Sequence, residues 1–155
     1  MVGTNHMQLG EFQFDIDHGS FRRITECWSG PGWDFNFSGK CVNGDFFGVD
    51  GRIGLYCEAA PLPLAKAADY TGIELDLPGD GDDATGEPFF AVDVGESYEV
   101  SDVRLRFAER DVGRYRIEIS GTVSKSVFGN PKQFTLSAWA DEHPDHSYGR
   151  GTSAT

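Results

Sequence analysis

The stretch Val103-Arg-Leu-Arg-Phe-Ala-Glu-Arg-Asp-Val-Gly-Arg-Tyr-Arg-Ile-Glu-Ile119 carries the pattern that decides the fold. Apolar residues take every second position in two runs: Val103, Leu105 and Phe107, then Tyr115, Ile117 and Ile119. Such alternation places apolar side chains on one face of a β-strand and polar side chains on the other. We therefore expect two strands that form a hairpin, with one face in the core and one face in water.

The same alternation recurs along most of the chain. It is found in six further runs: Phe12–Ile16, Trp33–Phe37, Ile53–Cys57, Ile73–Leu77, Phe90–Val94 and Phe134–Ala138. The turn-forming pairs Asn43-Gly44 and Asp50-Gly51 flank a short ninth candidate strand, Asp45–Val49. Short strands separated by turn residues predict an antiparallel β-sandwich or a flattened barrel of eight or nine strands.

Helical patterns are scarce. The segment Pro63–Asp69 could form two turns, because proline stands near its start and Gly72 follows its end. The segment Ser20–Trp28 could be a second short helix or an irregular strand. We therefore expect at most one or two short helices.

Composition and charge restrict the classes of partner. The 155 residues have the size of one domain, and an aromatic share of 13% is enough to fill a core. The formal net charge is −12. A field of that sign repels phosphate groups, so we expect no binding to nucleic acid or to a membrane surface. A basic protein, a polycation or a metal cation would be attracted.

The three cysteines and the apolar content bear on location. Cys27, Cys41 and Cys57 are widely spaced and form no CxxC pair, so they indicate neither a disulfide framework nor a zinc site. The chain has no basic stretch followed by an apolar one, and no apolar run of about 20 residues. A cytoplasmic location is expected, although a mature secreted form would look the same.

The two ends differ in composition from the rest of the chain. Residues 1–7 include two methionines and a His-Met pair, which is typical of a disordered or vector-derived leader. Residues 8–140 are expected to form a single β domain. Residues 141–155 are predicted to be a flexible polar tail, even though His143 and His146 stand there beside acidic residues.

Arginines crowd the polar face of the predicted hairpin, at Arg104, Arg106, Arg114 and Arg116. If Phe107 faces Tyr115, Arg106 lies opposite Arg116, and like charges across a ladder are unfavourable. Acidic residues of a neighbouring strand, such as Glu74 and Asp76, could supply counter-charges. Alternatively, the arginines form a weak site for a carboxylate, a phosphate or an acidic partner surface, since guanidinium groups bind such oxygens bidentately.

An acidic loop is the main candidate metal site. Four carboxylates stand close together with glycines between them: Asp80, Asp82, Asp83 and Glu87. They could surround Ca²⁺, which takes six to eight oxygen ligands, but their spacing does not fit the EF-hand pattern. An ordinary solvated connection has the same composition. No other cofactor is expected.

Two tryptophans give a second candidate ligand site. Trp28 and Trp33 flank the sequence Ser-Gly-Pro-Gly at 29–32, which could hold both rings on the surface. Exposed aromatic rings can stack on sugars, whereas core filling is the ordinary use of tryptophan. A carbohydrate-binding module would need at least one of the two exposed.

Motifs for catalysis are missing from the sequence. It contains no nucleophile elbow, no HExxH and no phosphate-binding loop, and His18 is the one well-placed general base. The sequence therefore favours a non-catalytic binding or interaction protein that recognises a protein or a small ligand through loops or the arginine-bearing face. The alternatives are a carbohydrate-binding module, assisted by calcium, and an enzyme of unrecognised type. The oligomeric state is left open.

Overall fold

The computed structural model describes residues 5–26, 31–44, 51–77, 89–124 and 129–147. Its ten strands form one sheet. They are β1 (His6–Leu9), β2 (Phe12–Glu26), β3 (Gly32–Cys41), β4 (Arg52–Ala60), β5 (Glu74–Leu77), β6 (Phe90–Asp93), β7 (Ser97–Asp111), β8 (Arg114–Val123), β9 (Lys132–Glu142) and β10 (His146–Ser147).

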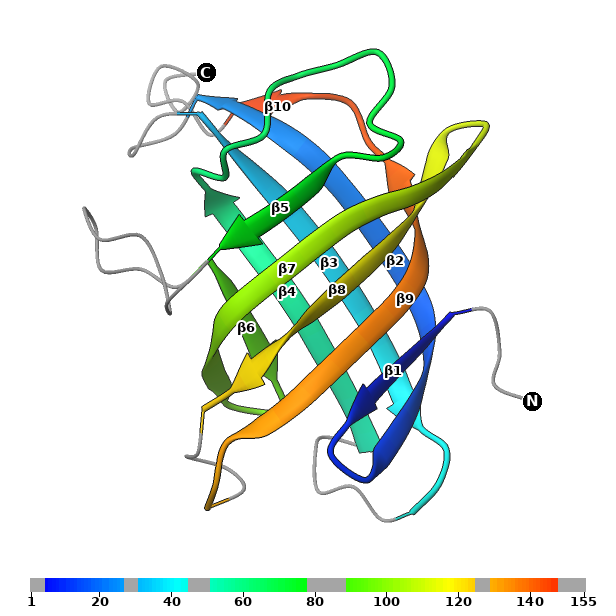
Figure 1. The fold of residues 1–155 in the computed structure, drawn as a ribbon, viewed down its shortest axis with the longest axis vertical. Coiled ribbons are helices and arrows are strands. Elements are labelled where there is room, and N and C mark those ends of the chain that lie inside the picture. The colour runs from blue at the N-terminus through cyan, green and yellow to red at the C-terminus, as the bar shows by residue number, and fades with distance from the viewer. Residues whose placement is uncertain (1–4, 27–30, 45–50, 78–88, 125–128, 148–155) are drawn as a thin grey trace, which may run out of the picture.

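The sheet closes on itself into a barrel of eight strands (Figure 1). Neighbouring strands follow the order β1-β9-β8-β7-β6-β4-β3-β2, and β1 then pairs with β2. β5 pairs with β7 beside β6, and β10 pairs with β2, so neither belongs to the closed ring. Of the two predicted architectures, the barrel is the one observed.

All eight strands expected from alternation are present, at or within one residue of the apolar positions that define them. The candidate strand Asp45–Val49 lies outside the described residues. None of the described residues forms a helix, in agreement with the expected limit of one or two short helices: 63–69 is irregular, and 20–26 belongs to β2, the strand alternative for that segment. The described part of the chain accordingly holds no membrane-spanning helix.

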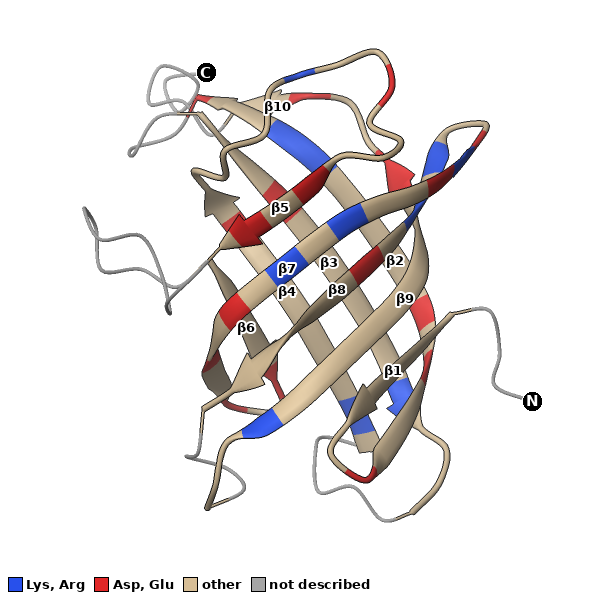
Figure 2. Cartoon of the chain, in the orientation of Figure 1, with Lys and Arg blue, Asp and Glu red and all other residues tan. Residues whose placement is uncertain are grey.

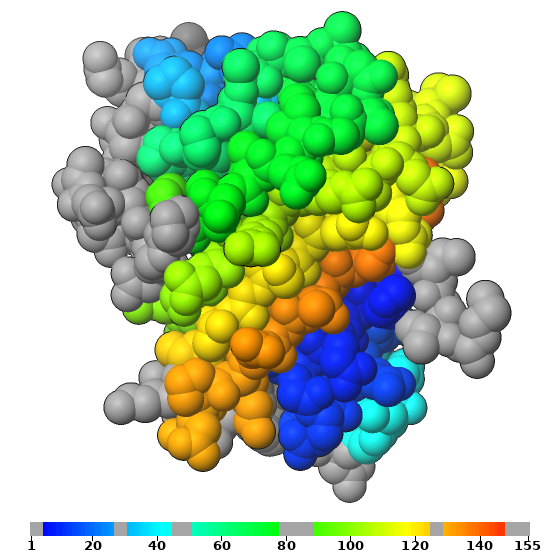
Figure 3. All heavy atoms as spheres, in the orientation of Figure 1, coloured from blue at the N-terminus to red at the C-terminus, as the bar shows by residue number. Residues whose placement is uncertain are grey.

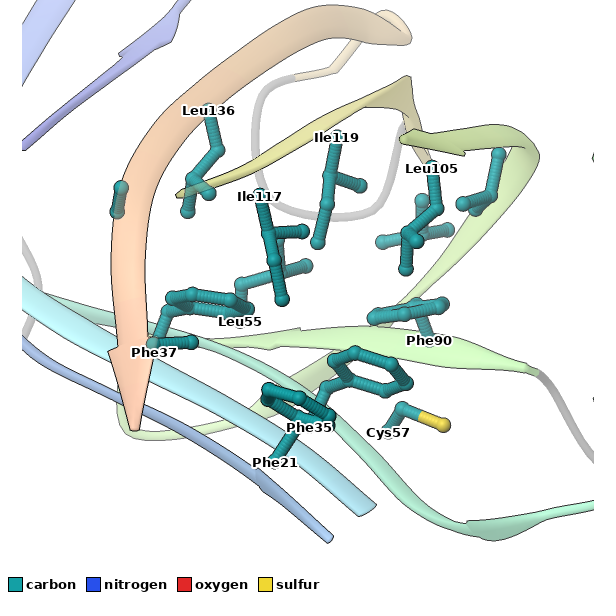
Figure 4. Close-up of a cluster of buried hydrophobic side chains, with 14 of the residues drawn as sticks. Phe21, Phe35, Phe37, Leu55, Cys57, Phe90, Leu105, Ile117, Ile119 and Leu136 are labelled. Atoms are coloured by element: carbon teal, nitrogen blue, oxygen red, sulfur yellow. The ribbon is translucent and has the colours of Figure 1, made fainter. Parts of the chain in front are cut away.

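Side chains fill the barrel interior (Figure 4). Phe21 stacks on Phe35 with ring centroids 5.5 Å apart, and Tyr70 stacks on Phe107 at 5.2 Å. Tyr115 meets the edges of these rings. Burial of each ring stabilises the fold by about 1.5–3 kcal/mol.

The segment between β4 and β5 runs across the upper end of the barrel in Figure 1 and supplies part of the core. Leu62, Leu64 and Tyr70 are buried. The indole N–H of Trp33 donates to the carbonyl oxygen of Leu64 at 2.9 Å, and the backbone N–H of Tyr70 donates to the hydroxyl of Tyr115 at 3.1 Å. These bonds hold the segment although it has no regular secondary structure.

The barrel closes where β1 lies between β2 and β9 (Figure 1). Met7 and Leu9 point into the core and are buried. Asn5 extends this seam, because its carbonyl accepts from the N–H of Ile16 at 3.0 Å and its side chain accepts from the N–H of Trp139 at 2.9 Å. The expectation that residues 1–7 lie outside the fold is therefore wrong for residues 5–7.

The expected tail is also partly ordered. Residues 141 and 142 complete β9, and β10 pairs with β2 in parallel. The carboxylate of Asp145 lies 2.9 Å from Lys66 Nζ and 3.8 Å from Arg23 Nη1, so it ties this segment to the barrel end. Apolar alternation could not reveal these residues, because their contacts are ion pairs and backbone hydrogen bonds.

One glycine permits β2 and β9 to meet directly beyond β1. A Cβ at Gly19 would overlap the carbonyl oxygen of Trp139 and come within 3.1 Å of the Phe37 ring. By contrast, a Cβ at Gly54 in β4 would meet its nearest atom at 3.8 Å, an ordinary contact. The seam therefore requires glycine at 19, and the barrel wall does not require it at 54.

We predict that Gly19→Ala lowers the free energy of unfolding by about 1–3 kcal/mol, because overpacking forces backbone shifts. Gly54→Ala serves as the matched control and should leave stability unchanged or raise it by up to about 1 kcal/mol. Urea denaturation followed by tryptophan fluorescence measures both. Equal effects of the two substitutions would contradict the close approach at the seam.

Asp69 organises the segment over the barrel end. Its Oδ1 accepts the hydroxyl of Thr71 at 2.7 Å and the backbone N–H of Thr71 at 2.9 Å, and Arg110 Nη1 lies 3.7 Å from Oδ2. The hydrogen bonds from Thr71, followed by the charge of Arg110, lower the pKa of Asp69. A carboxyl whose folded pKa is lowered stabilises the fold above its unfolded pKa of about 3.9, and this stability is lost as the pH falls through the folded pKa.

We therefore predict that Asp69→Asn lowers the thermal midpoint at pH 7, and that this deficit shrinks toward zero near about pH 2. Calorimetry of both proteins across this pH range is the measurement. Asp15→Asn, which makes the same chemical change at an exposed position of β2, is the control for this comparison. A deficit at Asp69 that does not change with pH would show that its charge contributes nothing.

Candidate functional site

β7 and β8 form the expected hairpin, but its register differs from the one considered from the sequence, in which Phe107 faces Tyr115. Phe107 lies opposite Ile117, and Leu105 lies opposite Ile119. Arg106 therefore faces Glu118 rather than Arg116, so the expected clash of like charges is wrong. The shift arises because the ladder changes register between Phe107 and Glu109, which sequence alternation alone cannot count.

A second irregularity decides that the arginines point outward. Val100 and Val103 are both buried, and the residue before Val103, Asp102, has a φ of 53°. The extra residue shifts the alternation by one position, and aspartate tolerates this left-handed conformation better than most residues. Without the bulge, Arg104 and Arg106 would share the inward face with Val100.

Acidic residues of β5 face the arginines of β7, as the sequence suggested. Glu74 lies opposite Arg106, and Asp76 lies opposite Arg104. Arg106 Nη1 donates to Glu118 Oε1 at 3.1 Å, whereas Arg104 Nε is 3.8 Å from Asp76 Oδ1. Figure 2 shows these charges as red bands on β5, blue bands on the adjacent part of β7 and a red band on β8.

Arg114 and Arg116 lie nearer the turn of the hairpin. Arg114 Nη2 donates to Asp111 at 3.1 Å, and its guanidinium lies 4.6 Å from the centroid of the Trp139 ring. Arg116 Nε is 3.8 Å from Glu109. Of the four arginines expected to form one site, only Arg104 and Arg106 line the groove described next.

Residues of five strands align in two rows across the outer face. In register, one row is Glu74, Arg106, Glu118, Ser137 and His6, and the other is Asp76, Arg104, Ser120, Thr135 and Gln8. The first row stays charged through Glu118 on β8 and becomes short at Ser137 on β9. The second row changes from charged side chains on β5 and β7 to the short hydroxyl side chains of Ser120 on β8 and Thr135 on β9. Both rows lie on the face turned to the viewer in Figure 3.

This change of side-chain length forms a groove of about 590 Å³, which we call the arginine groove. Ser120, Thr135 and Ser137 line its floor, and Arg104 and Arg106 stand on one side of them. The outer-face residues that define it are Glu74, Asp76, Arg104, Arg106, Glu118, Ser120, Thr135, Ser137 and His6. Hydroxyl groups both donate and accept hydrogen bonds, so the groove offers partners to either kind of polar group.

The other predicted ligand residues lie elsewhere. Trp33 is buried, and its N–H is bonded to Leu64, so it is a core residue and no sugar platform exists at this position. Trp28 and the acidic loop of Asp80, Asp82, Asp83 and Glu87 lie outside the described residues. Within the described ranges no cluster of His, Cys, Asp and Glu has the arrangement of a metal site.

His18 and Cys57, which a catalytic interpretation could pair as base and nucleophile, lie in different parts of the structure. His18 lines a small hollow of about 170 Å³ with Asp17, Trp139 and Asp141, and its Nε2 is 3.4 Å from Ser20 Oγ. Cys57 points into the core, where burial raises the pKa of its thiol. A buried, protonated thiol is a poor nucleophile.

The arginine groove is therefore the site that the structure assembles from predicted residues. Arg104 and Arg106 could be predicted from alternation, but the hydroxyl residues on β8 and β9 could not, because nothing in their local sequence distinguishes them from other exposed strand positions. No protein-family model, curated protein or solved structure matches this chain.

We predict that the paired charges of the groove contribute little to stability. The side chains of Arg104 and Asp76 are 77% and 69% exposed, and exposed ion pairs typically contribute about 0–1 kcal/mol. The double variant Arg104→Ala/Arg106→Ala should thus unfold within about 1 kcal/mol of the wild type in urea. A loss of several kcal/mol would instead make these arginines part of the framework.

Proposed function

We propose that this protein is a non-catalytic binding protein that recognises an extended segment of a protein partner through the arginine groove. The observation that carries this proposal is the alignment of charged and hydroxyl side chains in register across β5, β7, β8, β9 and β1. An extended peptide can place its own polar groups along such rows. Strands also hold these side chains more precisely than loops would.

The filled interior supports an outer-face site. Small-molecule pockets are typically concave, largely apolar and able to bury most of the ligand. In this barrel the inward space that would serve that purpose holds Phe21, Phe35, Tyr70, Phe107 and Tyr115. A groove on the outside, open along its length, suits a chain better than a small molecule.

The charges support a partner segment of mixed sign. Arg104 and Arg106 would bind its carboxylates, and Glu74, Asp76 and Glu118 would bind its basic groups. Because the pair of Arg104 with Asp76 is long and exposed, exchanging Asp76 for a partner carboxylate costs little. The net charge of −12 favours encounter with a partner that is basic overall.

The buried position of Trp33 favours this proposal over a carbohydrate-binding module, which needs an exposed aromatic platform. The arginine groove itself is lined by no aromatic residue among those described. Sugar recognition would therefore lack its usual stacking contact there.

The test uses a displayed library of random twelve-residue peptides selected on the whole protein. We expect the enriched peptides to shift the NMR amide signals of Ser120, Thr135 and Ser137. Arg104→Glu should weaken their binding by at least about tenfold, which is 1.4 kcal/mol. Lys40→Glu makes the same change of charge on an exposed residue of β3 and should alter the affinity by less than about threefold.

Three outcomes would count against the proposal. They are a selection that enriches no peptide, signal changes confined to residues outside the arginine groove, and equal weakening by Arg104→Glu and Lys40→Glu. The last result would show a response to net charge alone.

A further inference from the structure

A second hollow lies on the outer face of β2, β3, β4 and β6. Its volume is about 520 Å³, and its outward-pointing lining residues are Ser20, Arg22, Asp34, Asn36, Ser38, Gly54, Tyr56, Glu58, Asp93 and His143. It shares no residue with the arginine groove. Strand register places Gly54 between Ser38 on β3 and Asp93 on β6.

The hollow includes the position where Gly54 has no side chain, and we call it the Gly54 hollow. The neighbouring row brings Ser20, Asn36 and Tyr56 side by side on β2, β3 and β4. Because a Cβ at Gly54 would meet nothing closer than 3.8 Å, close packing does not demand glycine here. The space above it is instead open to a ligand.

Tyr56 is held in a fixed position at the edge of the Gly54 hollow. Its hydroxyl lies 2.6 Å from Ser97 Oγ on β7, so the side chain reaches across β6. Ala91 is its partner on β6 and is only 7% exposed although it lies on the outer face. A ring lying over Ala91 accounts for that burial and leaves the ring beside Asp93.

The charge of the Gly54 hollow is negative. Arg22 is the one Arg or Lys among its described lining residues, and it is committed to Asp34 at 3.1 Å. Asp34 also accepts the backbone N–H of Ala59 at 2.6 Å, so this pair is part of the framework. The carboxylates of Glu58 and Asp93 therefore lie in the hollow without a lysine or arginine of the hollow left to neutralise them.

These groups together match a primary ammonium ion. An ammonium has three donors and no acceptor, and the Gly54 hollow offers the acceptors of Asp93, Asn36 and Ser38. An aromatic face such as Tyr56 attracts a cation by about 0.5–2 kcal/mol, depending on how far the site is desolvated. The net charge of −12 draws cations toward the surface from a distance.

We propose that the Gly54 hollow binds an aliphatic primary amine, with the ammonium held by Asp93 and Asn36 beside the ring of Tyr56. The alkyl chain of the amine then occupies the space above Gly54. Free diamines and the lysine side chain of a protein share this chemistry. The proposal is independent of the arginine groove, because the two sites have no residue in common.

The test is NMR titration of the whole protein with 1,5-diaminopentane. We expect saturable shifts of the amide signals of Asn36, Gly54 and Tyr56. The isosteric neutral ligand 1,5-pentanediol should give none that saturate, because the Gly54 hollow selects for charge. Nα-acetyl-lysine amide, titrated separately, distinguishes the two sources: tighter binding than the diamine indicates a protein lysine, and weaker binding indicates a free amine.

Three variants locate the site. Gly54→Met fills the hollow and should weaken binding of the diamine by at least about tenfold. Asp93→Asn removes the charge but keeps an oxygen for the hydrogen bond that Asp93 accepts from Gly95 N–H, at 2.9 Å, and should weaken binding about as much. Tyr56→Leu should weaken it about threefold or more through loss of the cation–π contact.

Asp15→Asn is the matched control, because it removes one exposed carboxylate of β2 that does not line the Gly54 hollow. Equal weakening by Asp15→Asn and Asp93→Asn would overturn the proposal, as would shifts spread over the acidic surface or saturable binding of the diol. Absence of any saturable shift with either amine would overturn it as well. Since Asp93→Asn and Tyr56→Leu leave the backbone of β4 unchanged, they decide the matter even if Gly54→Met does not fold.

Discussion

The pairing of β1 with both β2 and β9 is the contact on which the rest of the structure depends. It joins the first strands to the last long strand, and without it β2 and β9 would be paired only at Ser20–Phe21 with Asp141–Glu142 and would leave backbone groups unpaired along the rest of their facing edges. Close contact at Gly19 and the hydrogen bonds of Asn5 continue the closure beyond β1. Closure also sets the barrel width, and so the volume that side chains must fill.

Because an eight-stranded barrel leaves an interior that side chains can fill, the aromatic residues are used there. This assigns Trp33 and Tyr70 to packing, and both proposed ligand sites therefore lie on the outer face. On that face, hollows form where neighbouring strand residues differ in side-chain length. The arginine groove arises where hydroxyl residues follow arginines, and the Gly54 hollow arises where a strand residue has no side chain.

The charges of the arginine groove are paired within the sheet. Arg106 faces Glu74 on one side and Glu118 on the other, whereas Arg104 faces a carboxylate, Asp76, on one side only. Exposed pairs of this kind can be exchanged for a partner's groups at small cost, because water already screens them. The pair of Arg22 with Asp34 differs, since Asp34 is also bonded to the backbone of β4, which makes it part of the framework.

The amino-acid sequence by itself determined the β class, the strand positions and the polar face that carries Arg104 and Arg106. Period-two alternation is a local property, so each strand from β2 to β9 could be identified from its own residues. The opposition of Glu74 and Asp76 to the arginines was also foreseeable, because an acidic strand was needed to balance them.

Tertiary structure alone decided closure, register and the two hollows. A bulge adds one residue without changing composition, so the pairing of Arg106 with Glu118 could not be counted from the chain. β1 and β10 are too short for their alternation to be recognised, and each pairs with a strand distant in sequence, β1 with β9 and β10 with β2. Gly54, Asn36 and Asp93 come from three separate strands, and only the sheet brings them together, because a surface site depends on lateral neighbours that no local pattern encodes.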